Sequence, residues 1–150
     1  MTIRVAIILA GGLGTRLNDV VPNLPKPMAP IHGRPFLEHQ MDYWISQGID
    51  KFILSVGYLK DIIINHFGSM YKGASIEYSI EKKPLGTGGG LLLSAQRLSK
   101  PFLVLNGDTF IEVDLNVLYK FHLKHNSKWT FSLFKTNQFD RYMGMDVDTC

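Results

Sequence analysis

An apolar run near the start of the chain leads directly into a glycine-rich loop, and it constrains the fold more than any other feature. Residues 5–10 read Val-Ala-Ile-Ile-Leu-Ala, and Gly11 and Gly12 follow at once. A short run of this kind is typical of a parallel strand that is buried on both faces. We therefore predict a strand over residues 3–10. The run is far too short to cross a lipid bilayer.

The rest of the chain alternates segments with strand-like and helix-like patterns. Apolar runs predict further strands over residues 51–56, 74–80, 101–106 and 129–135. Helical spacing predicts helices over residues 35–48, 59–67, 91–98 and 115–125, with glycine loops over 11–33 and 84–90. This alternation indicates an α/β fold with a mostly parallel sheet and helices on both faces.

Composition narrows the class of protein. The chain has 150 residues, of which 45% are hydrophobic and 19% charged, as in ordinary globular domains. Its one cysteine, Cys150, cannot form an internal disulfide, which favours a reducing, cytoplasmic location. The net charge of +3 is small and scattered, so we expect neither a nucleic-acid partner nor a membrane partner.

The first glycine loop has the composition of an anion-binding site. It reads Leu9-Ala10-Gly11-Gly12-Leu13-Gly14-Thr15-Arg16-Leu17. Backbone N–H groups of such a loop can surround phosphate oxygens, and Thr15 and Arg16 add a hydroxyl and a guanidinium donor. Lys26, between Pro25 and Pro27, adds a second cation on a stiffened backbone. A plain turn that joins a strand to a helix is the alternative.

Two more polar segments follow predicted strands. Residues 81–90 read Glu-Lys-Lys-Pro-Leu-Gly-Thr-Gly-Gly-Gly, and Asn106-Gly107-Asp108 follows the strand at 101–106. Ligands of such sheets bind beyond the carboxyl ends of the strands, so we expect these segments to meet the first loop at one edge. Asp108 suits Mg²⁺, which prefers few carboxylates together with phosphate oxygens and water. An ordinary turn aspartate is the alternative.

Residues 9–17 and 25–27 resemble the signature of the sugar-1-phosphate nucleotidylyltransferases, also called sugar-nucleotide pyrophosphorylases. That family carries Leu-Ala-Gly-Gly-x-Gly-Thr-Arg-Leu and then Pro-Lys-Pro after its first strand. The resemblance implies a Rossmann-like three-layer αβα sandwich, with residues 1–150 as the N-terminal, nucleotide-binding portion of a nucleotidyltransferase domain. It also implies a reaction of a nucleoside triphosphate with a sugar 1-phosphate that gives an NDP-sugar and pyrophosphate.

The resemblance implies roles for individual residues. Arg16, Lys26 and Asp108 are the predicted catalytic residues, and Asp108 would also bind Mg²⁺ and the sugar. The first two would neutralise the phosphates and the leaving pyrophosphate. The predicted nucleotide-binding residues are Leu9, Ala10, Gly11, Gly12, Gly14, Thr15, Arg16, Lys26, Glu81, Pro84, Gly86, Thr87, Asn106 and Gly107.

Glu81 is the residue that bears on the choice of base. It stands five residues before Gly86, the position at which the family contacts the base. An ionised glutamate has only acceptors, and guanine offers two adjacent donors, so this residue favours GTP. Uridylyl, thymidylyl or cytidylyl transfer are the alternatives, and so is a surface glutamate at the end of a strand.

The sugar is suggested only by likeness to one branch of the family. The segments around Lys26, Gly86 and Asp108, with residues 139–142, look most like D-glycero-α-D-manno-heptose 1-phosphate guanylyltransferases, which are close to mannose-1-phosphate guanylyltransferases. The expected product is therefore GDP-D-glycero-α-D-manno-heptose or GDP-mannose, for polysaccharide biosynthesis. Tyr142 and Gly144 are predicted to bind the sugar together with Asp108, although Met143 intervenes where the branch has glycine.

The C-terminus departs from the family pattern. The chain ends at Cys150, whereas the family continues with strands that carry a lysine for the sugar phosphate and a second metal aspartate. The sequence therefore leaves a second hypothesis, a non-catalytic nucleotide-binding or regulatory module. A sheet that lacks those strands would expose an edge able to pair with another chain, which keeps a homo-oligomer among the expected partners.

Overall fold

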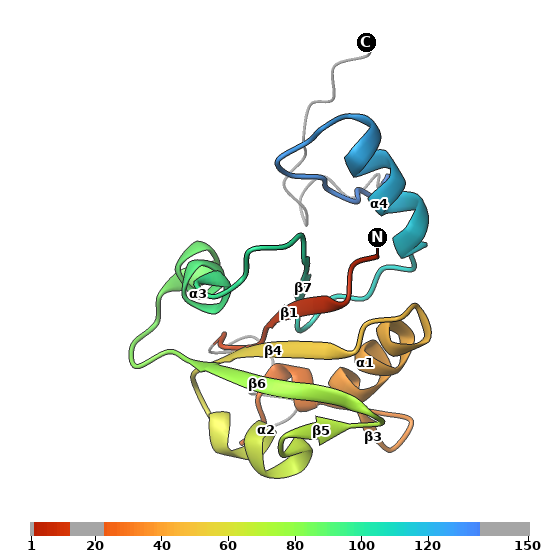
Figure 1. Ribbon diagram of the computed structural model, residues 1–150. Coiled ribbons are helices and arrows are strands. Elements are labelled where there is room, and N and C mark those ends of the chain that lie inside the picture. Colours follow the sequence, from red (N-terminus) through yellow and green to blue (C-terminus); the bar gives the residue numbers. More distant parts are fainter. Residues whose placement is uncertain (1, 13–22, 136–150) are drawn as a thin grey trace.

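A five-stranded sheet forms the centre of the molecule (Figure 1). The computed structural model describes residues 2–12 and 23–135. In spatial order, the strands of the sheet are β5 (Met70–Tyr71), β6 (Ala74–Ile80), β4 (Lys51–Val56), β1 (Val5–Leu9) and β7 (Leu103–Asn106). The other elements are η1 (Lys26–Met28), the paired strands β2 (Pro30–Ile31) and β3 (Arg34–Pro35), α1 (Phe36–Ser46), α2 (Lys60–Phe67), α3 (Gly86–Ala95) and α4 (Leu115–Lys124).

The sheet is mostly parallel, as the sequence predicts. β1 pairs in parallel with β4 and with β7, and β4 pairs in parallel with β6, while only the short β5 runs antiparallel. Ala6, Ile7 and Ile8 of β1 are completely buried because strands cover both edges of β1 and helices lie over both faces. The predicted α/β fold is therefore confirmed.

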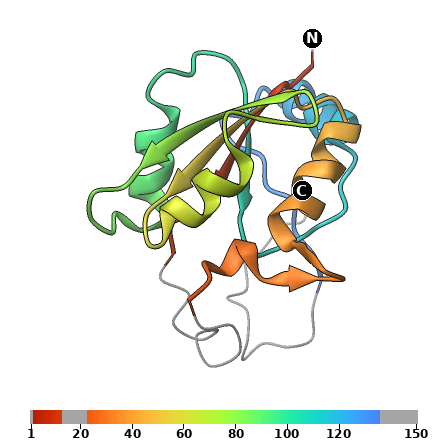
Figure 2. The same ribbon diagram turned by 90° about the horizontal axis from the view of Figure 1, so that it is seen from below.

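Helices cover the two faces of the sheet unequally (Figures 1 and 2). α1 and α2 lie on one face, where the main hydrophobic core joins Ile8, Phe52 and Leu54 of the sheet to Leu37 of α1 and Ile63 of α2. α3 lies on the other face, over β1, β4 and β6. The alternation of side chains along each strand supplies both faces with apolar groups.

The second glycine loop is shorter than predicted. The sequence predicts a loop over residues 84–90 and a helix from residue 91, but α3 begins at Gly86 and ends at Ala95. The low helix propensity of glycine is overridden by packing, because a Cβ at Gly90 would lie 2.7 Å from Glu81 Oε1 and 3.1 Å from Ser55 Oγ. A larger residue at position 90 would therefore displace the Glu81 carboxylate or the Ser55 hydroxyl.

The predicted strand over residues 129–135 is wrong. Alternating aromatic and polar side chains suggest a strand there, but the structure assigns none to these residues. A strand requires backbone hydrogen bonds to a neighbour, and none of the described strands pairs with this segment. Leu115 and Tyr119 of α4 are buried, but other large apolar side chains of α4 and of this segment are exposed: Val117, Phe121, Leu123, Trp129, Phe131, Leu133 and Phe134.

In residues 2–12 and 23–135, no helix combines the length and the hydropathy needed to cross a bilayer.

A charged network ties α1 to the short strands below it. Arg34 binds Glu38 and Asp42 of α1 at 2.8 Å each, Lys72 binds Asp42 at 2.8 Å, and His66 of α2 lies 2.7 Å from Glu38. Burial acts to raise the pKa of Glu38 and of Asp42. The hydrogen bonds from these partners outweigh burial and lower both pKa values below the ordinary 4.5 and 3.8. The ionised carboxylates therefore stabilise the folded state.

The lowered pKa values predict a loss of stability in acid. Stability from these groups is fully present above the ordinary pKa values and is lost as the pH falls through the lowered folded-state values. We expect the free energy of unfolding, measured by urea titration between pH 6 and about 2.5, to fall less steeply in a Glu38→Gln, Asp42→Asn double variant than in the wild type. Glu77→Gln, which removes an exposed carboxylate paired with Lys51, is the control and should keep the wild-type slope. Equal slopes in the double variant and the wild type would contradict this account.

Candidate functional site

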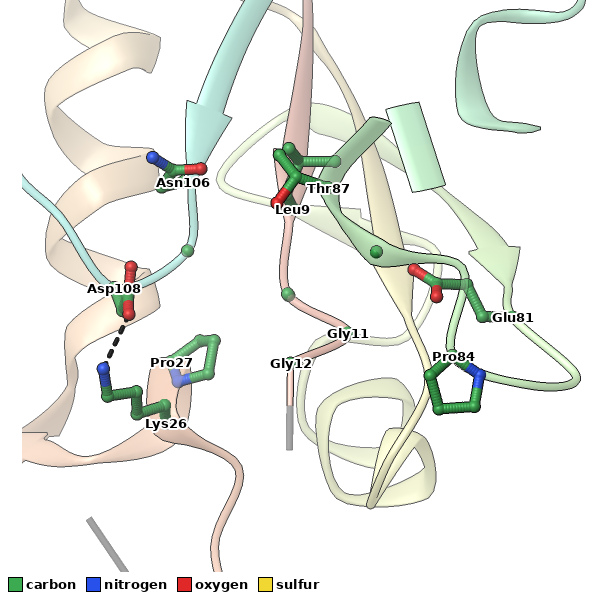
Figure 3. A pocket seen from close by; sticks show the side chains of 13 residues that line it. Leu9, Gly11, Gly12, Lys26, Pro27, Glu81, Pro84, Thr87, Asn106 and Asp108 are labelled. Carbon is green, nitrogen blue, oxygen red and sulfur yellow. Dashed lines mark hydrogen bonds and ion pairs between the residues drawn. The ribbon is translucent and has the colours of Figure 1, made fainter. Parts of the chain in front are cut away.

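The carboxyl ends of three parallel strands meet around one pocket of about 360 Å³. β1 ends at Leu9, β6 at Ile80 and β7 at Asn106, and the segment after each strand forms part of the wall. The lining residues are Leu9, Ala10, Gly11, Gly12, Lys26, Pro27, Glu81, Pro84, Gly86, Thr87, Asn106, Gly107 and Asp108. Figure 3 shows Lys26 and Asp108 on one side, Glu81 and Pro84 on the other, and Gly11 and Gly12 between them.

The structure brings together the separated segments that the sequence analysis expected to meet. Each predicted site residue in the described part of the chain lines this pocket, and Pro27 is the one lining residue not among the predicted set. The remaining predicted residues, Gly14, Thr15, Arg16, Tyr142 and Gly144, lie outside the described residues. Their roles stay predictions.

Lys26 is held at the pocket by the packing of its neighbours. Pro25, Pro27 and Met28 are buried, and the N–H of Met28 donates to the Pro25 carbonyl at 2.8 Å to form the turn η1. Lys26 Nζ lies 2.7 Å from Asp108 Oδ2, and the two side chains keep 35% and 42% of their exposure. An exposed pair of this kind contributes only about 0–1 kcal/mol to stability. The pair therefore contributes little to the stability of the fold.

The turn that carries Asp108 is fixed against β1. The N–H of Gly107 donates to the Leu9 carbonyl at 2.9 Å. A Cβ at Gly107 would lie 2.9 Å from that same oxygen and 3.0 Å from Cγ of Pro27. The absence of a side chain thus lets the β7 turn, the β1 loop and η1 approach one another closely enough to form a common wall.

Glu81 lies between the two glycine loops. Its Oε2 accepts from the N–H of Leu85 at 3.0 Å, and its Oε1 accepts from the Ser55 hydroxyl at 3.2 Å. A Cβ at Gly11 would lie 2.8 Å from Glu81 Oε1, so the first loop packs directly on the carboxylate. These contacts orient the carboxylate toward the pocket rather than into solvent at the end of a strand.

Ser55 is a residue that the sequence analysis missed. It is completely buried within β4, and its hydroxyl donates to Glu81. The only sequence signal is a serine inside the apolar run 51–56, which by itself does not reveal a partner 26 residues away. Parallel pairing of β4 with β6 brings Ser55 close to Glu81 in the folded chain.

The donor set of the pocket fits a magnesium ion that arrives with phosphate. Among the described residues, no group of three or more His, Cys, Asp or Glu side chains could hold a metal alone. Asp108 supplies one exposed carboxylate beside a pocket lined by backbone groups and a lysine. One or two carboxylates with substrate phosphates and water is the usual environment of Mg²⁺.

Comparison with known proteins identifies the family. The model of the nucleotidyl transferase family matches residues 5–145. The chain belongs to this family. The matched range includes each segment that lines the pocket.

Several relatives in this family are similar to the chain. It is 46% identical over 143 residues to the D-glycero-alpha-D-manno-heptose 1-phosphate guanylyltransferase of Campylobacter jejuni, covering 95% of the chain and 63% of that protein. It is 35% identical to the mannose-1-phosphate guanyltransferase of Aspergillus oryzae, covering 91% of the chain and 39% of that protein. Of the solved structures, HddC from Yersinia pseudotuberculosis complexed with GMP-PN matches with a TM-score of 0.73 and 39% identity, over 81% of the chain and 55% of HddC.

The turn at Gly107 gives a stability prediction. A Gly107→Ala substitution should lower the free energy of unfolding by about 1–3 kcal/mol, because the new methyl meets a backbone oxygen that is itself bonded to the turn. Gly88→Ala is the matched control: it lies in α3, where a Cβ would have nothing within 4 Å, and alanine favours a helix. Urea unfolding of both variants measures the difference. A loss of stability in Gly88→Ala equal to that in Gly107→Ala would refute the steric argument.

Proposed function

We propose that the chain provides the nucleotide-binding part of a sugar-1-phosphate guanylyltransferase. The reaction joins GTP and a manno-configured sugar 1-phosphate, either a heptose or mannose, to give a GDP-sugar and pyrophosphate. One observation carries the proposal: Lys26, Glu81 and Asp108, from three distant segments, line one pocket at the carboxyl edge of the sheet. The 46% identity to a heptose 1-phosphate guanylyltransferase supports the choice of sugar and base.

Glu81 is proposed to recognise guanine. Each carboxylate oxygen accepts one hydrogen bond from the protein, which leaves further lone pairs for the two adjacent donors of the base. Ser55 and the N–H of Leu85 fix the carboxylate before the nucleotide arrives. Uracil and thymine offer a single N–H between two carbonyl oxygens, which an ionised carboxylate repels.

Lys26 and Asp108 are proposed to act on the phosphates. Lys26 would neutralise phosphate charge, and Asp108 together with nucleotide phosphates would hold Mg²⁺, which would offset the negative charge of the phosphates. The backbone of residues 9–12 would donate to the triphosphate, with Gly14, Thr15 and Arg16 as further predicted contacts. In the described part of the chain, the edge of the sheet thus offers backbone donors and the Lys26 ammonium to a polyanion.

The chemistry is an in-line displacement. An oxygen of the sugar 1-phosphate attacks the α-phosphorus, a new P–O bond forms, and the bond to the β-phosphate oxygen breaks so that pyrophosphate leaves with its electron pair. Positioning and charge stabilisation supply most of the rate in phosphoryl transfer, so no protein nucleophile is required. Tyr142 and Gly144 remain the proposed sugar contacts together with Asp108.

The chain covers only part of the relatives that it matches: 63% of the heptose 1-phosphate guanylyltransferase of Campylobacter jejuni and 55% of HddC. The alternative to turnover is a module that binds nucleotide without reaction. In either case, residues 1–150 form the N-terminal, nucleotide-binding portion of the domain, and a cytoplasmic location, inferred from the single cysteine, belongs to the same proposal.

Release of pyrophosphate tests the activity. We expect release with GTP, Mg²⁺ and D-glycero-α-D-manno-heptose 1-phosphate or mannose 1-phosphate, and a loss of roughly 10²-fold or more in kcat/KM in Lys26→Met, because a fixed positive charge at the phosphates is removed. Lys51→Met is the matched control, since Lys51 forms an equally short ion pair of 2.6 Å with Glu77 outside the pocket. Nucleotide binding by calorimetry without pyrophosphate release would favour the module, and the absence of both would overturn the proposal.

The identity of the base is tested at Glu81. In Glu81→Gln, we expect the preference for GTP over UTP to fall by about tenfold or more, since a hydrogen bond to a charged group contributes roughly 1.5–3 kcal/mol. Glu77→Gln makes the same chemical change within β6, the strand that leads to Glu81, but away from the pocket, and should leave the preference unchanged. Competition between the two nucleotides for the protein measures the ratio. An unaltered preference in Glu81→Gln would show that this residue does not contact the base.

A further inference from the structure

A buried glutamine on α1 contacts the turn that carries Asp108. Gln40 is 1% exposed, and its side-chain N–H groups donate to the carbonyls of Asn106 and Thr109, both at 2.9 Å. These two carbonyls flank Gly107 and Asp108 in the chain. We propose that Gln40 is a positioning residue, which holds Asp108 ready to bind a metal–nucleotide complex. The inference rests on the proposed function.

The location of Gln40 is unusual for an amide. It stands on the apolar face of α1, beside Leu37, Met41 and Trp44, all of which are buried. A buried amide is unfavourable unless its polar atoms are hydrogen-bonded. Both N–H groups of Gln40 have acceptors, but its buried Oε1 has no hydrogen-bond partner among the described residues. The side-chain amide of Gln40 thus contributes through its two N–H donors. Its orientation is fixed, because the reverse orientation would place its oxygen against two carbonyl oxygens.

The two donors complete a support that acts from both sides of the turn. On the side of the sheet, the N–H of Gly107 donates to the Leu9 carbonyl at 2.9 Å. On the side of α1, Gln40 holds the carbonyls before and after the pair 107–108. The backbone at Asp108 is anchored in this way while its carboxylate points into the pocket and meets Lys26 at 2.7 Å (Figure 3). Partners that orient a metal ligand in this manner strongly affect metal affinity.

Gln47, the residue that follows the end of α1, provides a contrast seven residues after Gln40. Gln47 donates to the Val113 carbonyl at 2.9 Å and accepts from the N–H of Leu115 at 2.7 Å, and the Tyr43 hydroxyl also bonds to Val113. These contacts anchor the distal end of the segment that joins β7 to α4. Gln40 and Gln47 therefore have the same chemistry and hold the same connection, but only Gln40 holds the turn at Asp108.

Metal-dependent binding of nucleotide tests the proposal. For each variant, the affinity for GTP is measured by calorimetry with and without Mg²⁺, and bound Mn²⁺ is counted by electron paramagnetic resonance. In Gln40→Met, which keeps the length and removes the donors, we expect the gain in affinity due to the metal to fall by about 10- to 100-fold, with metal-free binding retained. In Gln40→Glu, whose carboxylate would face two carbonyl oxygens, we expect the metal-dependent gain in affinity to fall by at least as much. In Gln47→Met, the gain in affinity due to the metal should equal that of the wild type.

The outcomes separate this proposal from the proposed function. The role of Gln40 would be overturned if any folded Gln40 variant kept the wild-type, metal-dependent gain in affinity for GTP. It would also be overturned if Gln47→Met lost as much of that gain as Gln40→Met. Amide hydrogen exchange without nucleotide reads the anchoring directly: exchange at residues 107–110 should be faster in Gln40→Met, and exchange at 113–116 faster in Gln47→Met. Wild-type protein that binds no nucleotide would overturn the proposed function and the metal role together, whereas unchanged exchange at 107–110 would refute the anchoring alone.

Discussion

Parallel pairing of β1 between β4 and β7 is the constraint on which the rest of the structure depends. Because all three strands run in the same direction, the residues that follow β1 and β7 leave the sheet at the same edge, and β6, parallel to β4, delivers Glu81 there as well. The completely buried apolar residues of β1 make this arrangement stable. Strand direction thus brings most of the pocket wall together, and η1 and the start of α3 complete it.

Close packing then turns this shared edge into a site. Gly11, Gly90 and Gly107 stand where a methyl group would meet a carboxylate or a backbone oxygen within 3 Å, so the loops can approach each other only without side chains. The polar groups are in turn held by buried partners: η1 holds Lys26, and the Ser55 hydroxyl holds Glu81. A site with a rigid support of this kind can meet a charged ligand with little rearrangement.

Much of the fold was predictable because local pattern and tertiary context agree. The strands at 51–56 and 74–80 have the predicted bounds, since apolar runs and buried parallel strands coincide there. The start of α3 was mispredicted, because propensity alone favours a loop for its glycines, and sequence does not show that a Cβ at Gly90 would meet Glu81 and Ser55. The segment 129–135 has the alternation of a strand but has no partner strand among the described residues, and pattern alone cannot supply one.

The sequence by itself determined the order of apolar runs, the glycines and the charged residues, and these were enough to indicate an α/β fold, a phosphate-binding chemistry and the family. Tertiary structure decided which polar groups meet: that Lys26 contacts Asp108, that Ser55 donates to Glu81, and that Gln40 holds the Asp108 turn from a helix whose spacing reads as plain core. The physical reason is that a hydrogen bond is set by distance and direction in space. Partners separated by 26, 66 or 82 residues acquire these only when the sheet has formed.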